Sequence, residues 1–462
     1  MYPISDFVAA LGPIVSTTDP ISLRAKSRDR YAVSPMLKTM LEGKRADVVV
    51  SPASKAELIQ VVAAAAKFRI PITTRGGGTA NYGQSVPLHG GILLDMSGVA
   101  GVLWTRPGEI RALAGTIVDD MDTAAKAIGW ELRIFPTTKT TATIGGFLAG
   151  GTGGIGSASW GVLRDRGNIT AVEVISMEET PRVIELRGRD ARMVHHAYGA
   201  NCIISEVEMP LAPAWDWLEA IVTFPDYIDT VKFGVALGNE DGIVKKLLSV
   251  QEWPTPRLVG VLGDLVPDGH SMISCMVSSL CRQDFEELVA EHGGHLASVC
   301  REKQGPYAVP MYEFAYGHAL RQVQKSDPRR TSVEGFFKSD DLVGLVRRVH
   351  DKVDGMGPMR MELRRWGGAL VGSGSPYVIF ESEAQMARLV EIMQAEGVSV
   401  ANPHTSSVRS VGKKEVSERD IAFKRDMDPY GLLNPGRFDA DGKDEAFSAN
   451  LPTDSWMYRK AV

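Results

Sequence analysis

The stretch PITTRGGGTANYGQS at residues 71–85 decides how the first part of this chain folds. Three consecutive glycines, Gly76, Gly77 and Gly78, follow a short apolar run, and Arg75 directly precedes them. Because glycine has no side chain, backbone N–H groups in such a loop can approach a ligand closely and converge on an anion. The stretch therefore predicts a binding site for a phosphate group.

Length and composition are those of an ordinary globular protein. The chain has 462 residues, enough for about three domains, or for two of which one is large. Hydrophobic residues make up 44% and charged residues 23%, and the formal net charge is −5. Since no global basic surface follows from this balance, we expect no nucleic-acid partner, and the anion site must be local.

The cysteines and the amino terminus indicate where the protein works. Four cysteines show no CxxC spacing, which favours reduced thiols in a cytoplasmic protein over a disulfide or zinc site. The first residues, MYPISDFVAALGPIV, lack a basic region followed by a long apolar run, and no stretch of about 18 apolar residues occurs. We therefore expect a cytoplasmic protein without a membrane span.

The glycine loop sits in a regular pattern of helices and strands. Ser54 and Glu57 form a capping-box pattern ahead of apolar residues at helical spacing, and the strand after this helix leads into the loop. We expect further strands at residues 90–98 and 201–213, a helix at 121–128, and a hairpin formed by residues 169–177 and 181–188.

A second glycine-rich stretch covers residues 136–167. It contains too much glycine and threonine for a helix or strand of any length, so we expect an ordered loop system. A flexible linker is the weaker alternative, because apolar residues such as Phe147 and Trp160 punctuate the stretch.

The second half of the chain changes in style after a proline-flanked break near Pro213. Strand candidates at 218–224, 270–277, 359–366 and 375–382 alternate with helix candidates at 228–237, 281–292, 340–353 and 383–396. This order predicts a separate α+β domain with antiparallel strands and helices on one face. The predicted division is residues 1–213, with a core at about 42–213, then 214–400 and 401–462. The tail at 439–462 could cover a pocket or an interface, although a loosely ordered end is the default.

Two common phosphate-binding patterns, the P-loop and the Rossmann turn, do not fit this sequence. The GxxxxGK[ST] pattern of nucleotide-binding P-loops is absent at Gly76. A Rossmann turn fits poorly, because Pro87 and Gly90 stand where its helix should run. Two separated glycine loops suit a large, elongated anion such as a dinucleotide.

Four motifs in the same order resemble a known family: PITTRGGGTANYGQSVP, GGILLDMSG, TATIGGFLAGGTGGIGSASWG and NCIISEVEMPLAP. They look like the FAD-binding domain of the vanillyl-alcohol oxidase and p-cresol methylhydroxylase family. The later DPYGLLNPGRF resembles the end of FAD-linked oxidases related to the glycolate oxidase D subunit and to D-2-hydroxyacid dehydrogenases. The resemblance implies an α+β fold with a two-lobed FAD-binding domain, a separate α+β substrate (cap) domain, and a C-terminal segment that returns to the flavin.

The resemblance also implies the residues that bind FAD. They are Arg75, Gly76, Gly77, Gly78, Thr79, Ala80, Asn81 and Gly83 in the first loop, Pro136, Thr143, Ile144, Gly145, Gly146, Gly150, Gly153 and Gly154 in the second, Ile203 and Ile204 in the following strand, and Asn434 near the end. Members with covalent flavin often carry a histidine in the first loop or a cysteine in the second. Neither loop has one here, so we expect non-covalent FAD.

A metal is not expected. Metal-dependent D-2-hydroxyacid dehydrogenases of this family carry two histidines in one motif, and a glutamate and a histidine in a later one. The corresponding stretches are residues 367–377 and 402–407, where Ala369, Tyr377 and Pro403 replace three of the four and only His404 survives. One imidazole does not provide the three protein ligands of a catalytic ion.

His404 is therefore the first choice for the base that removes a substrate hydroxyl proton, with a packing or surface histidine as the alternative. Tyr377 is the second choice, as a hydroxyl that orients substrate, or else a half-buried strand aromatic. Arg364 and Arg365 alternate sides of a strand, so one could bind an anionic substrate group, and we choose Arg364 although alternation does not decide between them. Trp366 could line a substrate pocket or belong to the core.

The other arginines of this region, Arg321, Arg329 and Arg330, lie in a polar stretch and are expected to be solvated.

The leading hypothesis is an FAD-dependent oxidoreductase that oxidises the CH–OH group of a hydroxy acid or alcohol by hydride transfer to the flavin, without a metal. The alternative is a flavin-binding electron-transfer subunit of a multi-protein oxidase complex. A third possibility is non-redox flavin use, as in the related alkyl-dihydroxyacetonephosphate synthases, for which this chain is short. The expected partners are a small-molecule substrate, an unknown electron acceptor, and further subunits in a homo- or hetero-oligomer.

Overall fold

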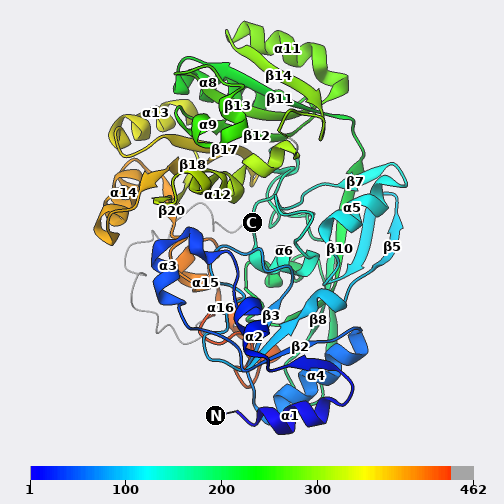
Figure 1. The fold of residues 1–462 in the computed structure, drawn as a ribbon. Coiled ribbons are helices and arrows are strands. Elements are labelled where there is room, and N and C mark those ends of the chain that lie inside the picture. The colour runs from blue at the N-terminus through cyan, green and yellow to red at the C-terminus, as the bar shows by residue number, and fades with distance from the viewer. Residues whose placement is uncertain (1, 308, 439–462) are drawn as a thin grey trace.

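A computed structural model describes residues 2–307 and 309–438, and the predicted tail at 439–462 lies outside the described residues. The protein is mixed α/β, and its described strands form four sheets (Figure 1). Two of these sheets come from the chain up to Pro213. A larger, eight-stranded sheet lies at the other end of the molecule and takes its strands from residues 217–401.

The first sheet has the order β1-β2-β4-β3, and β2, β4 and β3 are parallel. Helix α4 links β2 to β3, and the Ser54 hydroxyl caps it by accepting a hydrogen bond from Glu57 N–H at 3.2 Å. The predicted capping box is only half formed, because the Glu57 carboxylate accepts from Ala53 N–H instead. The bounds are α1 (Ile4–Leu11), β1 (Val15–Thr17), β2 (Val48–Ser51), α4 (Lys55–Phe68), β3 (Ile72–Arg75) and β4 (Ile92–Asp95).

The second sheet is antiparallel and has β10 at its centre. It confirms the predicted hairpin of β8 and β9, the long strand up to Pro213, and the helix that precedes β7. The bounds are β5 (Val102–Arg106), β6 (Glu109–Leu113), α5 (Val118–Lys126), β7 (Trp130–Leu132), β8 (Ala171–Ile175), β9 (Val183–Arg187) and β10 (Ile203–Pro213).

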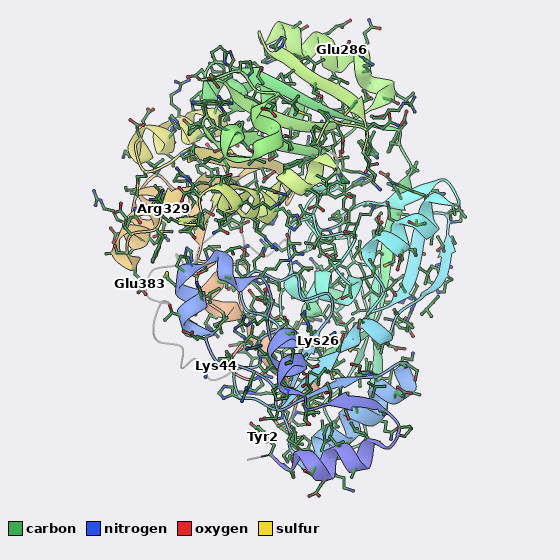
Figure 2. The ribbon with its side chains drawn as sticks, viewed as in Figure 1. Tyr2, Lys26, Lys44, Glu286, Arg329 and Glu383 are labelled. Carbon is green, nitrogen blue, oxygen red and sulfur yellow. The ribbon has the colours of Figure 1, made fainter. Side chains whose placement is uncertain are left out.

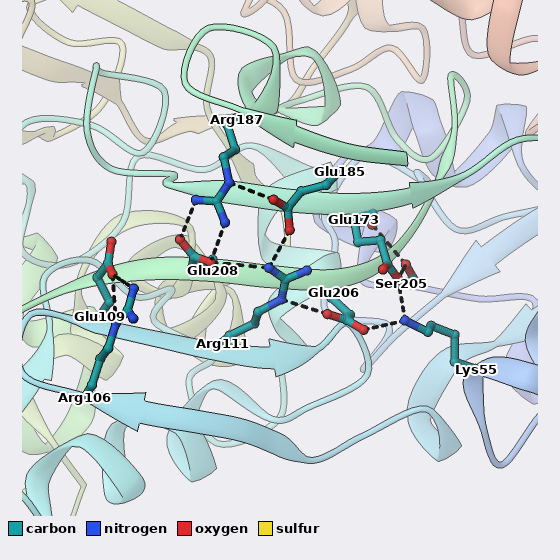
Figure 3. A network of polar contacts seen from close by, with 10 residues as sticks. All are labelled: Lys55, Arg106, Glu109, Arg111, Glu173, Glu185, Arg187, Ser205, Glu206 and Glu208. Carbon is teal, nitrogen blue, oxygen red and sulfur yellow. Dashed lines mark hydrogen bonds and ion pairs between the residues drawn. The ribbon is translucent and has the colours of Figure 1, made fainter. Parts of the chain in front are cut away.

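A network of ion pairs ties helix α4, which follows β2 of the first sheet, to the second sheet (Figure 3). Lys55 of α4 reaches Glu173 at 2.8 Å and Glu206 at 2.6 Å, both on the second sheet. Arg111 on β6 lies 2.7 Å from Glu206 and 2.7 Å from Glu185. Although partial burial opposes it, hydrogen bonds to Glu185 and Glu206 raise the pKa of Arg111.

The prediction that residues 136–167 contain no helix was wrong. Helix α6 (Ile144–Gly150) begins at Thr143, whose hydroxyl accepts a hydrogen bond from Gly146 N–H at 3.2 Å, and a shorter helix α7 (Ser157–Trp160) follows. Gly145 has no room for a side chain, because a Cβ there would lie 2.8 Å from the Ala114 Cβ. Close packing of Ile144, Phe147 and Leu148 therefore outweighs the low helix propensity of glycine.

The large sheet is antiparallel throughout, in the order β14-β11-β13-β12-β17-β18-β16-β20. Helices α8, α11, α13 and α14 pack on one face and bury a common apolar core with it, as the sequence predicted (Figure 1). The bounds are β11 (Trp217–Phe224), α8 (Tyr227–Asn239), β12 (Lys245–Gln251), β13 (Ser271–Ser278), α11 (Arg282–Glu291), β14 (His295–Arg301), α12 (Tyr316–Ser326), β16 (Glu334–Phe337), α13 (Leu342–Val353), β17 (Met359–Trp366), β18 (Ala369–Pro376), α14 (Glu383–Ala395) and β20 (Ser399–Ala401). Of these, β12, β14, β16, β18, β20 and α12 were not predicted, because the strand predicted at 375–382 overlaps β18 only at its end.

The last described segment returns to the first sheet. After α16 (Glu418–Met427), Leu433 forms an isolated parallel bridge with Ile72, the first residue of β3. Asn434 N–H donates to the Ile72 carbonyl at 2.7 Å, and Ile72 N–H donates to the Leu432 carbonyl at 2.8 Å. This segment therefore borders the strand that leads into the glycine loop.

Shorter elements are α2 (Pro20–Lys26), α3 (Pro35–Met40), α9 (Thr255–Leu258), α10 (Gly260–Gly263), β15 (Arg330–Thr331), β19 (Val378–Ile379) and α15 (Val408–Val411). No helix among the described residues is both long and apolar enough to pass through a membrane.

The buried carboxyl of Glu219 on β11 holds the loop that leads to α12. Its oxygens accept backbone hydrogen bonds from Met311 N–H at 2.7 Å and Lys303 N–H at 3.3 Å. Burial nevertheless raises the pKa of Glu219 from 4.5 to about 7. The folded protein therefore binds this proton more tightly than the unfolded chain, so the associated stability is present below about pH 4.5 and is lost as the pH rises through 7.

We expect Glu219→Gln to remove this pH dependence. Between pH 5 and pH 8 the wild type should lose about 2 kcal/mol of stability relative to the variant, since each pKa unit is worth about 1.4 kcal/mol. Thermal unfolding midpoints of both proteins at the two pH values measure the difference. If the difference between the wild-type and variant midpoints is the same at pH 5 and at pH 8, the raised pKa of Glu219 is wrong.

Candidate functional site

A large cavity lies where the glycine loop, the second glycine stretch, the large sheet and the C-terminal segment meet. The glycine loop follows β3, and α6 with the loop after it forms the adjoining wall. The opposite wall comes from α12 and from β16 and β17, on the side of the large sheet away from α8, α11, α13 and α14. Loops gathered from both ends of the molecule thus surround one space.

Most of the predicted site residues line this cavity. They are Arg75, Gly76, Gly77, Gly78, Thr79, Ala80, Asn81, Pro136, Thr143, Gly145, Gly146, Gly150, Gly153, Gly154, Ile204, Arg364 and His404. The two glycine stretches, separated by about sixty residues in the sequence, therefore form neighbouring walls of one space.

Five predicted residues lie behind the cavity wall. Gly83, Ile144 and Ile203 pack beneath the loops, and Gly83 faces Leu41. Asn434 is fully buried and donates hydrogen bonds to the Gln84 carbonyl at 2.8 Å and the Tyr198 carbonyl at 2.7 Å. Because Gln84 and Tyr198 both line the cavity, Asn434 holds its wall from behind. Tyr377 is also fully buried, with its ring 5.9 Å from the Arg360 guanidinium.

The glycine walls fit the pyrophosphate of FAD. A Cβ at Gly77 would overlap the Thr141 carbonyl oxygen, and one at Gly76 would overlap the Thr143 hydroxyl, so the first loop can approach the second only as bare backbone. Beside them, Arg75 Nη1 is buried without a hydrogen-bond partner among the described residues. Although Arg75 as a whole is only partly buried, a cationic nitrogen without a hydrogen-bond partner favours an anion beside it. These residues would therefore hold the pyrophosphate.

His404 is held by a residue from far away in the sequence. Its Nδ1 lies 2.8 Å from the Ser34 hydroxyl, which also accepts a hydrogen bond from Leu37 N–H at the start of α3. Nε2 is buried and has no hydrogen-bond partner among the described residues. Burial lowers the pKa of His404 to about 4, so the imidazole is neutral near pH 7.

The strand β17 settles which arginine faces the cavity. Met361 and Leu363 point into the helix-covered core, whereas Arg364 lines the cavity together with Arg360. Arg365 points the other way and pairs with the exposed Asp241 at 2.9 Å.

Two charged residues from other parts of the chain, Glu334 and Lys413, lie near Arg364. The Nη2 atom of Arg364 lies 3.7 Å from Glu334 of β16, and Lys413 of the C-terminal segment pairs with the same carboxylate. Lys413 also donates to the Tyr82 hydroxyl at 2.7 Å. Although burial would raise it, the charges of Lys413 and Arg364 lower the pKa of Glu334 to about 2. This wall carries the three cations Arg360, Arg364 and Lys413 and the anion Glu334, so its positive charge exceeds its negative charge.

Sequence analysis missed several of these residues. Ser34, Glu334 and Lys413 belong to no motif, and only the alternation in residues 359–366 could have paired Arg360 with Arg364. Arg330 was wrongly predicted to be solvated: it is mostly buried and donates to the Tyr377 carbonyl at 2.7 Å. Arg329 does lie at the outer surface, with its side chain 68% exposed (Figure 2).

No group of three or more His, Cys, Asp or Glu side chains within residues 2–307 and 309–438 is arranged to hold a metal ion. The metal-free site remains a prediction.

Comparisons with known proteins agree with this geometry. The family described as FAD binding domain matches residues 46–184. An uncharacterized FAD-linked oxidoreductase of Mycobacterium tuberculosis is 24% identical over 188 residues, which cover 38% of this chain and 40% of that protein's length. Glycolate oxidase subunit GlcD of Bacillus subtilis is 28% identical over 449 residues, or 88% of this chain and 91% of the relative.

The fold recurs in a solved structure. That of an alkyldihydroxyacetonephosphate synthase superposes with a TM-score of 0.68 at 16% identity, covering 95% of this chain and 86% of that one. These matches support FAD as the cofactor predicted from the sequence and agree with the family resemblance, since the chain is similar to FAD-linked oxidoreductases. Within that class, the chain is similar along most of its length to a glycolate oxidase subunit.

The contact between the glycine walls gives a direct test of FAD binding. Gly77→Ala should reduce the FAD content of the purified protein at least about tenfold, because the Thr141 backbone cannot move aside for a methyl group. Absorbance of the acid-released flavin measures the content. Gly242→Ala is the matched control, since a Cβ there meets nothing within 4 Å, and equal FAD content in both variants would refute the assignment.

Proposed function

We propose that this protein oxidises the CH–OH group of a hydroxy acid, passing a hydride to non-covalently bound FAD without the help of a metal ion. The observation that carries the proposal is the buried pair Arg360 and Arg364 on the wall opposite the glycine loops. We also propose the division into an FAD-binding domain (1–213), a cap (214–400) and a returning segment (401–462), and a cytoplasmic location.

The arginines would bind the substrate carboxylate. Arg360 and Arg364 are 7% and 3% exposed, and the Nε of each lacks a hydrogen-bond partner among the described residues. Their nearest carboxylates, Glu362 and Glu334, lie 3.6 and 3.7 Å away, longer than a good charge-assisted hydrogen bond. A substrate carboxylate would complete this pairing and fix the hydroxyl-bearing carbon in the cavity. Tyr377, behind Arg360, would support that side chain.

His404 would take the hydroxyl proton. This role requires the proton of the neutral imidazole to lie on Nδ1, donated to the Ser34 hydroxyl, so that the Nε2 lone pair is free. Bound FAD supplies the hydride acceptor, and the products are a 2-oxo acid when the substrate is a 2-hydroxy acid and a protonated His404. Ser34 would orient the ring, and the closed glycine walls would exclude water from the reacting carbon.

A second candidate is an electron-transfer subunit of an oxidase complex. It is favoured by the name of one relative, a glycolate oxidase subunit, and by its coverage of 88% of this chain. An anaerobic experiment separates the two: a self-sufficient enzyme loses its flavin absorbance when a hydroxy acid is added alone, whereas a relay subunit needs its partner.

Substituting the two neighbouring arginines tests the carboxylate site. Arg364→Met should lower kcat/KM for a hydroxy acid about a hundredfold, since a buried charge-assisted contact is lost. Arg365→Met, on the opposite face, should change it by less than about twofold, because an exposed ion pair contributes little. Steady-state kinetics at equal FAD content measures both, and equal losses would count against the site.

The pH dependence tests His404. Because its pKa is lowered to about 4, kcat/KM should be constant from pH 6 to pH 8 and should fall only as the pH drops toward 4, where the ring becomes protonated. Stopped-flow pH jumps between pH 3.5 and 8 keep the protein folded during the measurement. His404→Asn should lose most of the rate, and its kcat/KM should no longer fall as the pH drops toward 4. If the variant shows the same fall, His404 is not its source.

A further inference from the structure

Three aromatic rings surround the Arg364 guanidinium. Its central carbon lies 5.5 Å from the ring centre of Phe336, 5.5 Å from Trp366 and 5.9 Å from Tyr316. The rings come from β16, β17 and α12, and all three line the cavity. Val162 adds a further apolar side chain to this part of the wall.

The rings are fixed before any ligand arrives. Phe336 and Trp366 pack edge to face, with centroids 5.1 Å apart at 87°. The Arg164 guanidinium lies 4.0 Å from the Trp366 ring centre, and the Tyr316 hydroxyl shares a hydrogen bond of 2.8 Å with the Ser157 hydroxyl. Phe336 and Trp366 are only 2% and 7% exposed, so each borders the cavity with a small part of its ring. Because these parts are held at several points, they cannot collapse onto a small substrate and remain as an apolar wall for a ligand of matching size.

The rings around Arg364 limit where the carbon chain of an acid bound to it can lie. The carbon chain next to its carboxylate must run along the cavity past these rings, since the guanidinium sits among them. Glycolate has no side chain that could cover the wall, and lactate has only a methyl group. An aromatic substituent would instead bury its faces and edges against Phe336, Trp366 and Tyr316.

We propose that the substrate is a 2-hydroxy acid with an aromatic side chain, of the 3-phenyllactate or mandelate type. This inference rests on the proposed function and narrows its substrate class. In this step a hydride, which carries two electrons and one proton, passes from the hydroxyl-bearing carbon to FAD. The hydroxyl proton passes to His404. The product is the aromatic 2-oxo acid.

The first experiment compares substrates with the FAD-loaded protein under anaerobic conditions. Both enantiomers of 3-phenyllactate and mandelate, together with lactate, 2-hydroxyglutarate and the achiral glycolate, are mixed with it, and the loss of flavin absorbance is followed. We expect an aromatic acid to give a second-order reduction rate constant at least about tenfold above that of the others, the least that a filled apolar pocket usually provides. A faster reaction with glycolate, lactate or 2-hydroxyglutarate overturns the aromatic inference and leaves the proposed function standing. Flavin reduction by none of the acids overturns both.

The second experiment measures binding without turnover. Calorimetry with 3-phenylpropionate and propionate, which lack the hydroxyl group, reports affinity alone. Phe336→Leu should weaken 3-phenylpropionate about tenfold and leave propionate unchanged, since it removes one ring of the wall. Phe337→Leu is the matched control: this neighbour on the same strand points into the helix-covered core, and it should preserve the ratio of the two affinities.

Trp366→Leu provides an independent variant if Phe336→Leu does not retain FAD. Wild-type protein that binds both acids equally, or variants at Phe336 and Trp366 that weaken both acids alike, would overturn the proposal.

Discussion

The close approach of two bare backbone stretches is the constraint on which the site depends. Gly76 and Gly77 lie against the backbone and hydroxyl groups of residues 141–143, where no side chain would fit. This contact brings loops from the first sheet and from α6 into one wall, and it leaves the partly buried Arg75 beside them. The returning segment reinforces the arrangement, because Asn434 pairs with the Ile72 backbone and holds the loops that carry Gln84 and Tyr198.

The opposite wall depends on a simple alternation. Met359, Met361 and Leu363 of β17 pack under the helices of the large sheet. Arg360, Arg364 and Trp366, on the other side of the strand, line the cavity. A single strand therefore serves both the stability of the large sheet and the charge of the site. The partly buried Glu334 and Lys413 link this wall to the C-terminal segment and, through Tyr82, to the glycine loop, so that three distant parts of the chain close around one space.

Sequence reasoning succeeded where a structure is encoded locally. The hairpin of β8 and β9, the strand β10 and the four helices on the large sheet all follow from periodicity within short windows. It failed at α6, where tertiary packing of Ile144, Phe147 and Leu148 outweighs glycine content. It also missed short strands such as β16, because four residues carry too little pattern to distinguish a strand from a loop.

The sequence by itself pointed to the cofactor, because its contiguous glycine-rich motifs resemble those of an FAD-binding domain and can be recognised without any distant partner. Only the tertiary structure decided how the other wall is built. Ser34 and His404 are separated by 370 positions, and nothing local to either residue predicts their contact. The choice of Arg364 over Arg365, and the rings around it, likewise depended on which face of β17 the helices cover, which alternation alone leaves undecided.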